Sequence, residues 1–207
     1  MVPFIQMSSI IVERAAEVFR RHGGILRTKQ VLALGVHPRT LYEMRDRAVL
    51  EQVSRGIYRL ATLPTLSQPD LVTVALRVPR AVICLISALS FHDLTSEIAH
   101  EVQIALPRGT KRPVLEHPPV RVFRFSGPAL TEGMETVKID DIQVHIYSPA
   151  KAVADCFRFR NKIGLDVAIE ALDLCLKRGR AQPSEILQYA RVCRMEKVMM
   201  PYLQART

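Results

Sequence analysis

The sequence predicts an α+β fold in two domains, and three observations support this prediction. A stretch that contains proline, serine and threonine, Thr62 to Asp70, divides the chain into a short first part and a longer second part. Strand-like runs occur in both parts. Amphipathic helical patterns then dominate the C-terminal end. We therefore expect a first domain over residues 1–66 and, over residues 67–207, a mixed α+β domain with a small sheet and a C-terminal helical region.

The first domain contains three predicted helices. The first starts at Ser8 or Ser9 and ends at a pair of glycines. A second helix has Thr28 as a suitable N-cap, and Gly35 provides the break after it. The third starts at Pro38, because proline suits the first helical position. The second helix carries the apolar residues Val31, Leu32 and Leu34. The apolar residues of the first and third helices expected to face the core are Ile11, Ala15, Val18, Phe19, Leu41, Met44 and Ala48.

Two strand-like runs, Val49–Val53 and Ile57–Leu60, flank the turn sequence Ser54-Arg55-Gly56 and predict a hairpin. Helices followed by such a hairpin form a winged helix-turn-helix, in which the second helix of the motif enters the DNA major groove. Some proteins with this geometry never contact DNA. Charge favours DNA binding here, because residues 1–66 contain ten Lys/Arg and five Asp/Glu, and a positive surface displaces counterions from DNA.

The outward face of the third helix supplies candidates for contacts with double-stranded DNA. The residues expected to read bases are Arg39, Tyr42 and Glu43. The residues expected near phosphates are Thr28, Lys29, Arg45 and Arg47, with Arg55 at the wing tip. Thr40 and Arg59 complete the expected DNA-contacting set. Alternatively, Arg39 is a solvated surface residue, and Arg55 and Arg59 only keep the hairpin edge soluble.

Composition limits the class of protein. The chain has 207 residues, of which 48% are hydrophobic and 24% charged, which is typical of a globular protein. A pI near 9.8 indicates an anionic partner, either nucleic acid or a membrane surface. The longest apolar run, Ala81 to Phe91, is about half of the ~20 residues that span a bilayer and is expected to be a buried helix. With no signal peptide apparent, we expect a cytoplasmic protein without membrane contact.

The four cysteines show no metal-ligand spacing. They are far apart and lack any CxxC pattern, so we expect free buried thiols in a reducing compartment and no bound metal or cofactor. Their positions are Cys84, Cys156, Cys175 and Cys193.

The second domain alternates between helical and strand patterns. The predicted helices are Leu71–Arg77, Ala81–Leu94, a helix opened by Ser148-Pro149, a helix from Leu165 to Lys177, and a last one from Pro183 to Arg194. The predicted strands are Val102–Leu106, Val120–Phe125, Val137–Ile139 and Ile142–Tyr147. The last two flank Asp140-Asp141 and predict a second hairpin.

Four segments together resemble the AbiEi-type antitoxins, over roughly residues 8–180. They are LGVHPRTLYEMRDRAVLEQVSRGIYRL within residues 24–60, ICLISALSFHDLT (Ile83–Thr95), IYSPAKAVADCFRFR (Ile146–Arg160) and IEALDLCL (Ile169–Leu176). The resemblance implies an N-terminal winged helix that represses its own operon by binding promoter repeats. It also implies a C-terminal domain that neutralises a nucleotidyltransferase-like AbiEii toxin, often in abortive infection by bacteriophage.

Catalysis is not expected. His92 and Asp155 are polar residues on otherwise apolar helices. Either they form a site that contacts a partner or performs catalysis, or they are buried and make structural hydrogen bonds. The sequence has no glycine-rich phosphate loop, nucleophile elbow or metalloprotease motif. The basic loop Arg108–Arg112 could contact DNA, an acidic partner or only solvent. Two other functions stay open: a ligand-sensing regulator, and a nuclease directed to nucleic acid.

Overall fold

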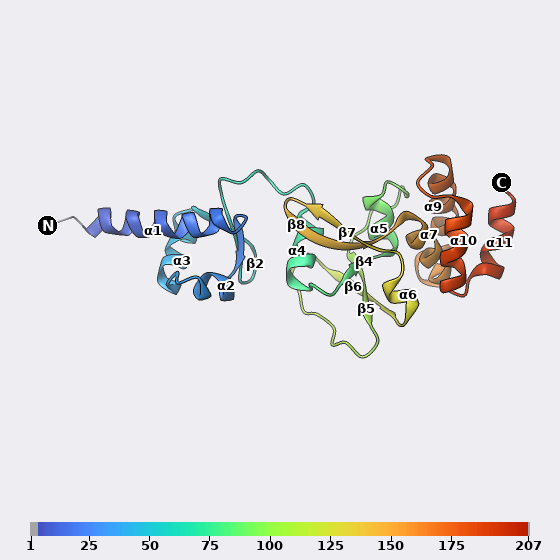
Figure 1. Cartoon of the computed structure of the whole chain (residues 1–207), viewed down its shortest axis with the longest axis horizontal. Helices are drawn as coiled ribbons and strands as arrows, with labels where there is room; N and C mark the ends of the chain where they lie inside the picture. Colours follow the sequence, from blue (N-terminus) through green and yellow to red (C-terminus); the bar gives the residue numbers. More distant parts are fainter. Residues whose placement is uncertain (1–3, 207) are drawn as a thin grey trace. The chain divides into compact units, whose positions relative to one another are not determined.

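The computed structural model describes residues 4–206 and divides the chain between Ser67 and Gln68 into two units. Helices and two separate sheets confirm the predicted α+β class (Figure 1). The first unit contains α1 (Phe4–Arg21), β1 (Ile25–Arg27), α2 (Thr28–Ala33), α3 (Pro38–Asp46), β2 (Leu50–Ser54) and β3 (Ile57–Leu60). This order of elements is that of a winged helix-turn-helix, in which α2 and α3 form the motif and β2–β3 the wing.

The core of the first unit lies between α1, the two helices of the motif and the sheet. From α1 it takes Val12, Ala15, Ala16 and Phe19, which follow the three- and four-residue spacing of a buried helix face. From the rest of the unit it takes Leu26, Val31, Val36, Leu41, Met44, Leu50, Tyr58 and Leu60. Burial of these side chains fixes the rotation of α3, so its opposite face is the one that solvent reaches.

Four of the apolar residues named from the sequence are not in the core, and two of them, Ile11 and Ala48, were predicted to be buried. Ile11, Leu32 and Leu34 are 47%, 40% and 40% exposed. Ile11 is adjacent to the buried face of α1 but not on it. Ala48 is exposed because α3 has already ended at Asp46 and the chain turns there with a φ of 55°.

The sheet of the first unit has three strands in the order β1-β3-β2, and the sequence did not predict β1. Leu26 in β1 pairs with Tyr58 in β3, which places β3 at the centre of the sheet. Two helix starts also differ from the prediction. α1 begins at Phe4, earlier than Ser8 or Ser9, and α2 is capped by Arg27, with Thr28 as its first residue.

The second unit is built on a mixed five-stranded sheet in the order β6-β5-β4-β8-β7 (Figure 1). Its strands are β4 (Val82–Ile83), β5 (Val102–Pro107), β6 (Val120–Phe125), β7 (Met134–Ile139) and β8 (Ile142–Tyr147). Its helices are α4 (Pro69–Arg77), α5 (Leu85–Phe91), α6 (Pro128–Thr131), α7 (Pro149–Arg158), α8 (Arg160–Ile163), α9 (Leu165–Lys177), α10 (Pro183–Val192) and α11 (Glu196–Gln204). Strand β6 forms one edge and pairs only with β5, in parallel register.

The structure confirms the second hairpin and corrects one helix prediction. Asp140 and Asp141 have φ values of 48° and 66°, as the tight turn between β7 and β8 requires. The stretch Ala81–Leu94 is not one helix, because it first forms the buried strand β4 and then α5. A short strand buried on both faces lacks polar alternation, so its pattern resembles that of a buried helix. Helix α11 was not predicted.

Helix α7 contains both residues of a buried ion pair. Ser148 caps the helix as predicted, and its side chain accepts a hydrogen bond from the backbone N–H of Lys151. The ammonium of Lys151 pairs with Asp155 one turn later, and both side chains are fully buried. The Sγ of Cys193 donates to Asp155 Oδ1 at 3.1 Å, and Lys151 Nζ lies 4.1 Å from the ring centroid of Tyr147. The pair therefore connects α7 to strand β8 and to the end of α10.

His92 and the cysteines have internal roles of the same kind. His92 Nε2 lies 2.8 Å from the carbonyl oxygen of Tyr147 and donates to it, and burial lowers the pKa of the ring. All four cysteines are free and buried, as predicted. Burial raises the pKa of Cys193 to about 12 and that of Cys175 to about 11, which suppresses thiolate chemistry at both.

Candidate nucleic-acid interface

The turn between α2 and α3 sets the direction in which α3 leaves the core. Gly35 has a φ of 84°, a conformation that favours glycine, and Val36 next to it is buried. His37 caps α3, with its Nδ1 accepting from the backbone N–H of Arg39 at 3.2 Å, and Pro38 occupies the first helical position. The local sequence therefore starts α3 at a fixed point, with Arg39 in its first turn.

The outer face of α3 is accessible to a ligand. Leu41 and Met44 are fully buried and anchor the inner face. Arg39 is exposed, and Tyr42 three residues later is 46% exposed. Glu43 follows one turn after Arg39 and is partly exposed. A helix that presents Arg, Tyr and Glu at this spacing matches the donor and acceptor groups that read base edges in a major groove.

The charges on α3 are partly paired with one another. Arg45 Nη2 lies 2.7 Å from Asp46 Oδ1, and its guanidinium carbon is 5.3 Å from the ring centroid of Tyr42. Arg47 Nη1 lies 3.2 Å from Glu43 Oε1. Among residues 4–206, no ion pair involves Arg39. Arg39 can therefore reach a ligand without first giving up a carboxylate partner.

The wing is attached to the start of α2. The backbone N–H and the hydroxyl of Thr28 donate to the carbonyl oxygen of Gly56 at 2.9 and 3.3 Å. Gly56 has a φ of 75°, which a side chain would strain. Lys29, which is exposed, and Arg55 flank these two hydrogen-bonded residues. Lys29 and Arg55, two of the residues expected near phosphates, are thus each next in sequence to a residue of the hydrogen-bonded pair that joins the wing to α2.

Two members of the expected DNA-contacting set are buried, which corrects their assignment. Thr40 is 9% exposed and faces α1, and Arg59 is 6% exposed. Arg59 Nη1 pairs with Glu51 at 3.1 Å, while Nη2 donates to the carbonyl oxygen of Pro64. The strand pattern did not reveal this, because it shows neither the pairing of Arg59 with Glu51 nor the return of the chain at Pro64 to the same side chain.

Replacing Arg59 with alanine should destabilise the first unit. The substitution removes hydrogen bonds to Glu51 and to Pro64, so we expect the free energy of unfolding to fall by about 1–3 kcal/mol. Urea denaturation followed by circular dichroism measures this change. A variant as stable as the parent, but with a reduced salt dependence of DNA binding, would instead identify Arg59 as a phosphate contact.

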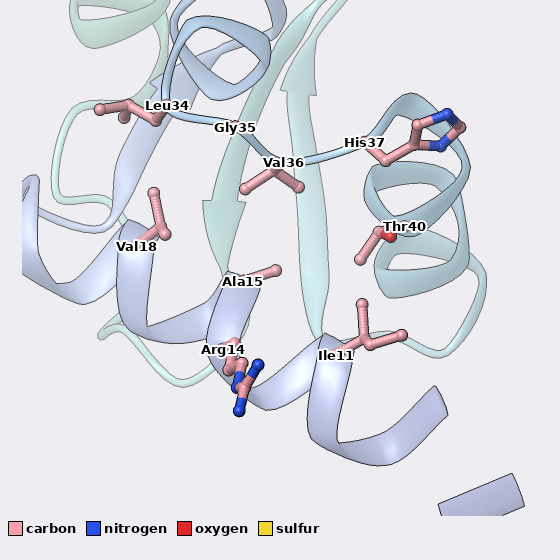
Figure 2. A pocket seen from close by; sticks show the side chains of 9 residues that line it. All are labelled: Ile11, Arg14, Ala15, Val18, Leu34, Gly35, Val36, His37 and Thr40. Atoms are coloured by element: carbon pink, nitrogen blue, oxygen red, sulfur yellow. The ribbon is translucent and has the colours of Figure 1, made fainter. Parts of the chain in front are cut away.

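A groove of about 280 Å³ lies between α1 and the turn that joins α2 to α3 (Figure 2). Figure 2 shows Val36 pointing toward Ala15 on α1 and Thr40 pointing toward Ile11. The side chains that line it are Ile11, Arg14, Ala15, Val18, Leu34, Val36, His37 and Thr40. The groove explains why Ile11 and Leu34 are exposed, because both lie on its walls.

The second unit has a smaller pocket, of about 140 Å³. It is lined by polar residues such as Asp70, Ser87, Ser90 and His100. Pockets for drug-sized ligands usually measure about 300–1,000 Å³, so this one is small for a sensor of such molecules. Within the described residues, no three side chains of metal-binding type lie together. The same residues include no helix that combines the length and apolarity needed to cross a membrane.

Comparison with known proteins bears on the first unit. Residues 13–61 match the family model described as "Transcriptional regulator, AbiEi antitoxin". The match runs from α1 through the motif to the end of the wing, and it confirms the resemblance to AbiEi-type antitoxins over these residues. A search of curated proteins found no match to the chain.

Proposed function

We propose, from the match of residues 13–61 to the AbiEi antitoxin regulators, that this chain is a transcriptional autorepressor and antitoxin. In this proposal the first unit binds repeats in the promoter of its own operon. The second unit counters a nucleotidyltransferase-like toxin encoded by the same operon and has no catalytic role. The protein acts in the cytoplasm, where its DNA target is.

The observation that best supports DNA binding is the outer face of α3. The exposed Arg39 and Tyr42 are on a helix whose inner face is anchored by fully buried residues, so the outer face is rigid. The wing is hydrogen-bonded to the start of α2, where Lys29 is exposed. A rigid reading helix beside a basic wing fits a duplex, with α3 in the major groove and the wing on the backbone.

Binding to the chain's own promoter tests the DNA part of the proposal. We expect the purified protein to shift a duplex that contains the region upstream of its gene, and to shift a scrambled duplex of equal length much less. Because phosphate contacts release counterions, affinity for both duplexes should fall as salt rises from 50 to 200 mM. Equal affinity for the two duplexes at both salt concentrations would contradict sequence-specific repression.

Coexpression tests the antitoxin part. The gene next to this one should encode a nucleotidyltransferase-like protein that stops growth when expressed alone. Coexpression of the full chain should restore growth, and so should a full chain with Arg39 replaced by alanine, since that residue is assigned to DNA. Failure of both to restore growth would leave a DNA-binding regulator without an antitoxin role.

A further inference from the structure

The edge of the second sheet has a cluster of aromatic rings that the proposed DNA contacts do not use. Phe123 on the edge strand β6 meets Phe159 edge-on, with ring centroids 5.1 Å apart. Phe125, two residues further along β6, lies 5.3 Å from the same Phe159 ring. Phe123 and Phe125 are buried, whereas Phe159 is partly exposed. The cluster therefore reaches the surface at Phe159, where α7 ends.

Three cations surround these rings. The guanidinium carbon of Arg121 lies 5.2 Å from the centroid of Phe123, and that of Arg158 lies 5.5 Å from the centroids of both Phe125 and Phe159. The ammonium of Lys162 lies 6.0 Å from Phe123 and 5.9 Å from Phe159. Contact with ring faces attracts each cation to the cluster. Three like charges are thus gathered around these three rings.

The basic surface continues along the whole of β6. At its start, Arg112 donates to the carbonyl oxygen of Val120 at 3.4 Å. At its end, the backbone N–H of Arg108 donates to Phe125, and Arg124 donates to Pro107. A strand of six residues measures about 20 Å, so the basic edge extends over about that length. We use the name basic edge for Arg108, Arg112, Arg121, Arg124, Arg158 and Lys162.

Acidic partners are few along the basic edge. Within residues 4–206, its one ion pair joins Arg121 to Glu101, at a long 3.5 Å. Elsewhere in the second unit, exposed cations have close partners, such as Lys138 with Asp141 at 2.7 Å and Arg191 with Glu196 at 2.9 Å. A surface that collects cations and leaves most of them without a carboxylate partner is suited to a polyanion.

We propose that the basic edge binds single-stranded nucleic acid. The guanidinium groups of Arg121 and Arg158 each lie over a phenylalanine ring, and both residues are only partly buried, which leaves room for an unpaired base to stack on the guanidinium. Lys162, Arg112 and Arg108 are exposed and contact phosphates. A duplex offers the same phosphates but hides the faces of its bases, so stacking selects a single strand.

Fluorescence anisotropy with labelled twelve-residue oligomers of uridine (U12) and of deoxythymidine (dT12) tests this proposal. The full chain should bind at least one of them at 50 mM salt and more weakly at 200 mM. Replacing both Arg158 and Lys162 with alanine should weaken binding about tenfold or more. A control that replaces Lys138 and Arg191 removes the same charge elsewhere in the unit and should bind like the parent. Tighter binding of U12 than of dT12 would identify RNA as the ligand.

Lys162→Glu provides a second variant, because Lys162 is exposed and its replacement should leave the fold intact. It should lower affinity for the single strand, whereas Arg39→Ala should lower affinity for the promoter duplex alone. Undetectable binding of both oligomers would overturn the proposal. An equal loss of affinity in the Arg158/Lys162 double variant and in the Lys138/Arg191 control would also overturn it. Equal binding of polyglutamate and U12 would also overturn it, in favour of an acidic protein partner. The results with U12 and dT12 do not depend on whether the first unit binds a promoter.

Discussion

Replacing Asp155 with alanine should lower the free energy of unfolding of the second unit by about 3–5 kcal/mol. The substitution leaves the ammonium of Lys151 fully buried and without its carboxylate partner. It also removes the acceptor for the thiol of Cys193. Relaxation around Lys151 is restricted, since a Cβ added to Gly133 would lie 2.6 Å from the Lys151 Cβ. Urea denaturation monitored by the near-ultraviolet signal of the tyrosines measures the loss.

Two controls distinguish the effect of leaving a buried charge unpaired from the effect of removing any ion pair. Asp141→Ala removes one partner of an exposed ion pair and should cost far less. A double variant, Lys151→Met with Asp155→Leu, replaces the buried pair with apolar side chains of similar volume and should recover much of the stability. If Asp155→Ala and Asp141→Ala had equal effects, the buried pair would not hold α7 in place.

Replacing Arg39 with alanine should reduce the preference of the protein for its promoter. An arginine that donates two hydrogen bonds to a guanine contributes about 1–3 kcal/mol of discrimination, so the ratio of affinities for promoter and scrambled duplex should fall about 5- to 150-fold. Competition gel shifts with the two duplexes measure this ratio. The fold should be unaffected, because Arg39 is exposed and has no ion pair among the described residues.

Two further variants serve as comparisons for Arg39→Ala: one removes an expected phosphate contact, and the other removes a cation outside the proposed interface. Arg55→Ala at the wing should lower affinity for both duplexes alike and reduce the salt slope by about one. Arg20→Ala on α1 removes an exposed cation that pairs with Glu13 and Glu17, and it should leave binding unchanged. If Arg39→Ala behaved like Arg55→Ala, Arg39 would contact phosphate and another residue would read the bases.

Much of this fold could be predicted where the signal is local. Periodicity placed Leu41 and Met44 inside and Arg39 outside, and the structure has α3 in that rotation. Ser148 followed by proline located the start of α7. Each of these features depends on residues within one or two turns of the chain. A local sequence pattern is therefore sufficient to predict them.

The missed features depend on partners distant in the sequence or on very short elements. Strand β1 has three residues and β4 has two, which is too few for a two-residue period to appear. Helix α11 contains Pro201, which disfavours a helix prediction. Arg59 is buried in contact with Glu51 on the neighbouring strand and with the carbonyl oxygen of Pro64 beyond the wing, contacts that a strand pattern does not show. The basic edge joins β6 to the end of α7, more than thirty residues later, so no local pattern shows it.

The carboxylates beside the α3 arginines have a consequence for kinetics. Residues 38–47 contain three arginines and two acids, so the segment has a net charge of only +1. Affinity for arbitrary DNA depends mainly on total positive charge, whereas affinity for the operator also depends on base contacts. In the proposed DNA-binding role, Glu43 and Asp46 would therefore shorten residence on the many wrong sites of a chromosome and leave more of the protein free to search for the right one.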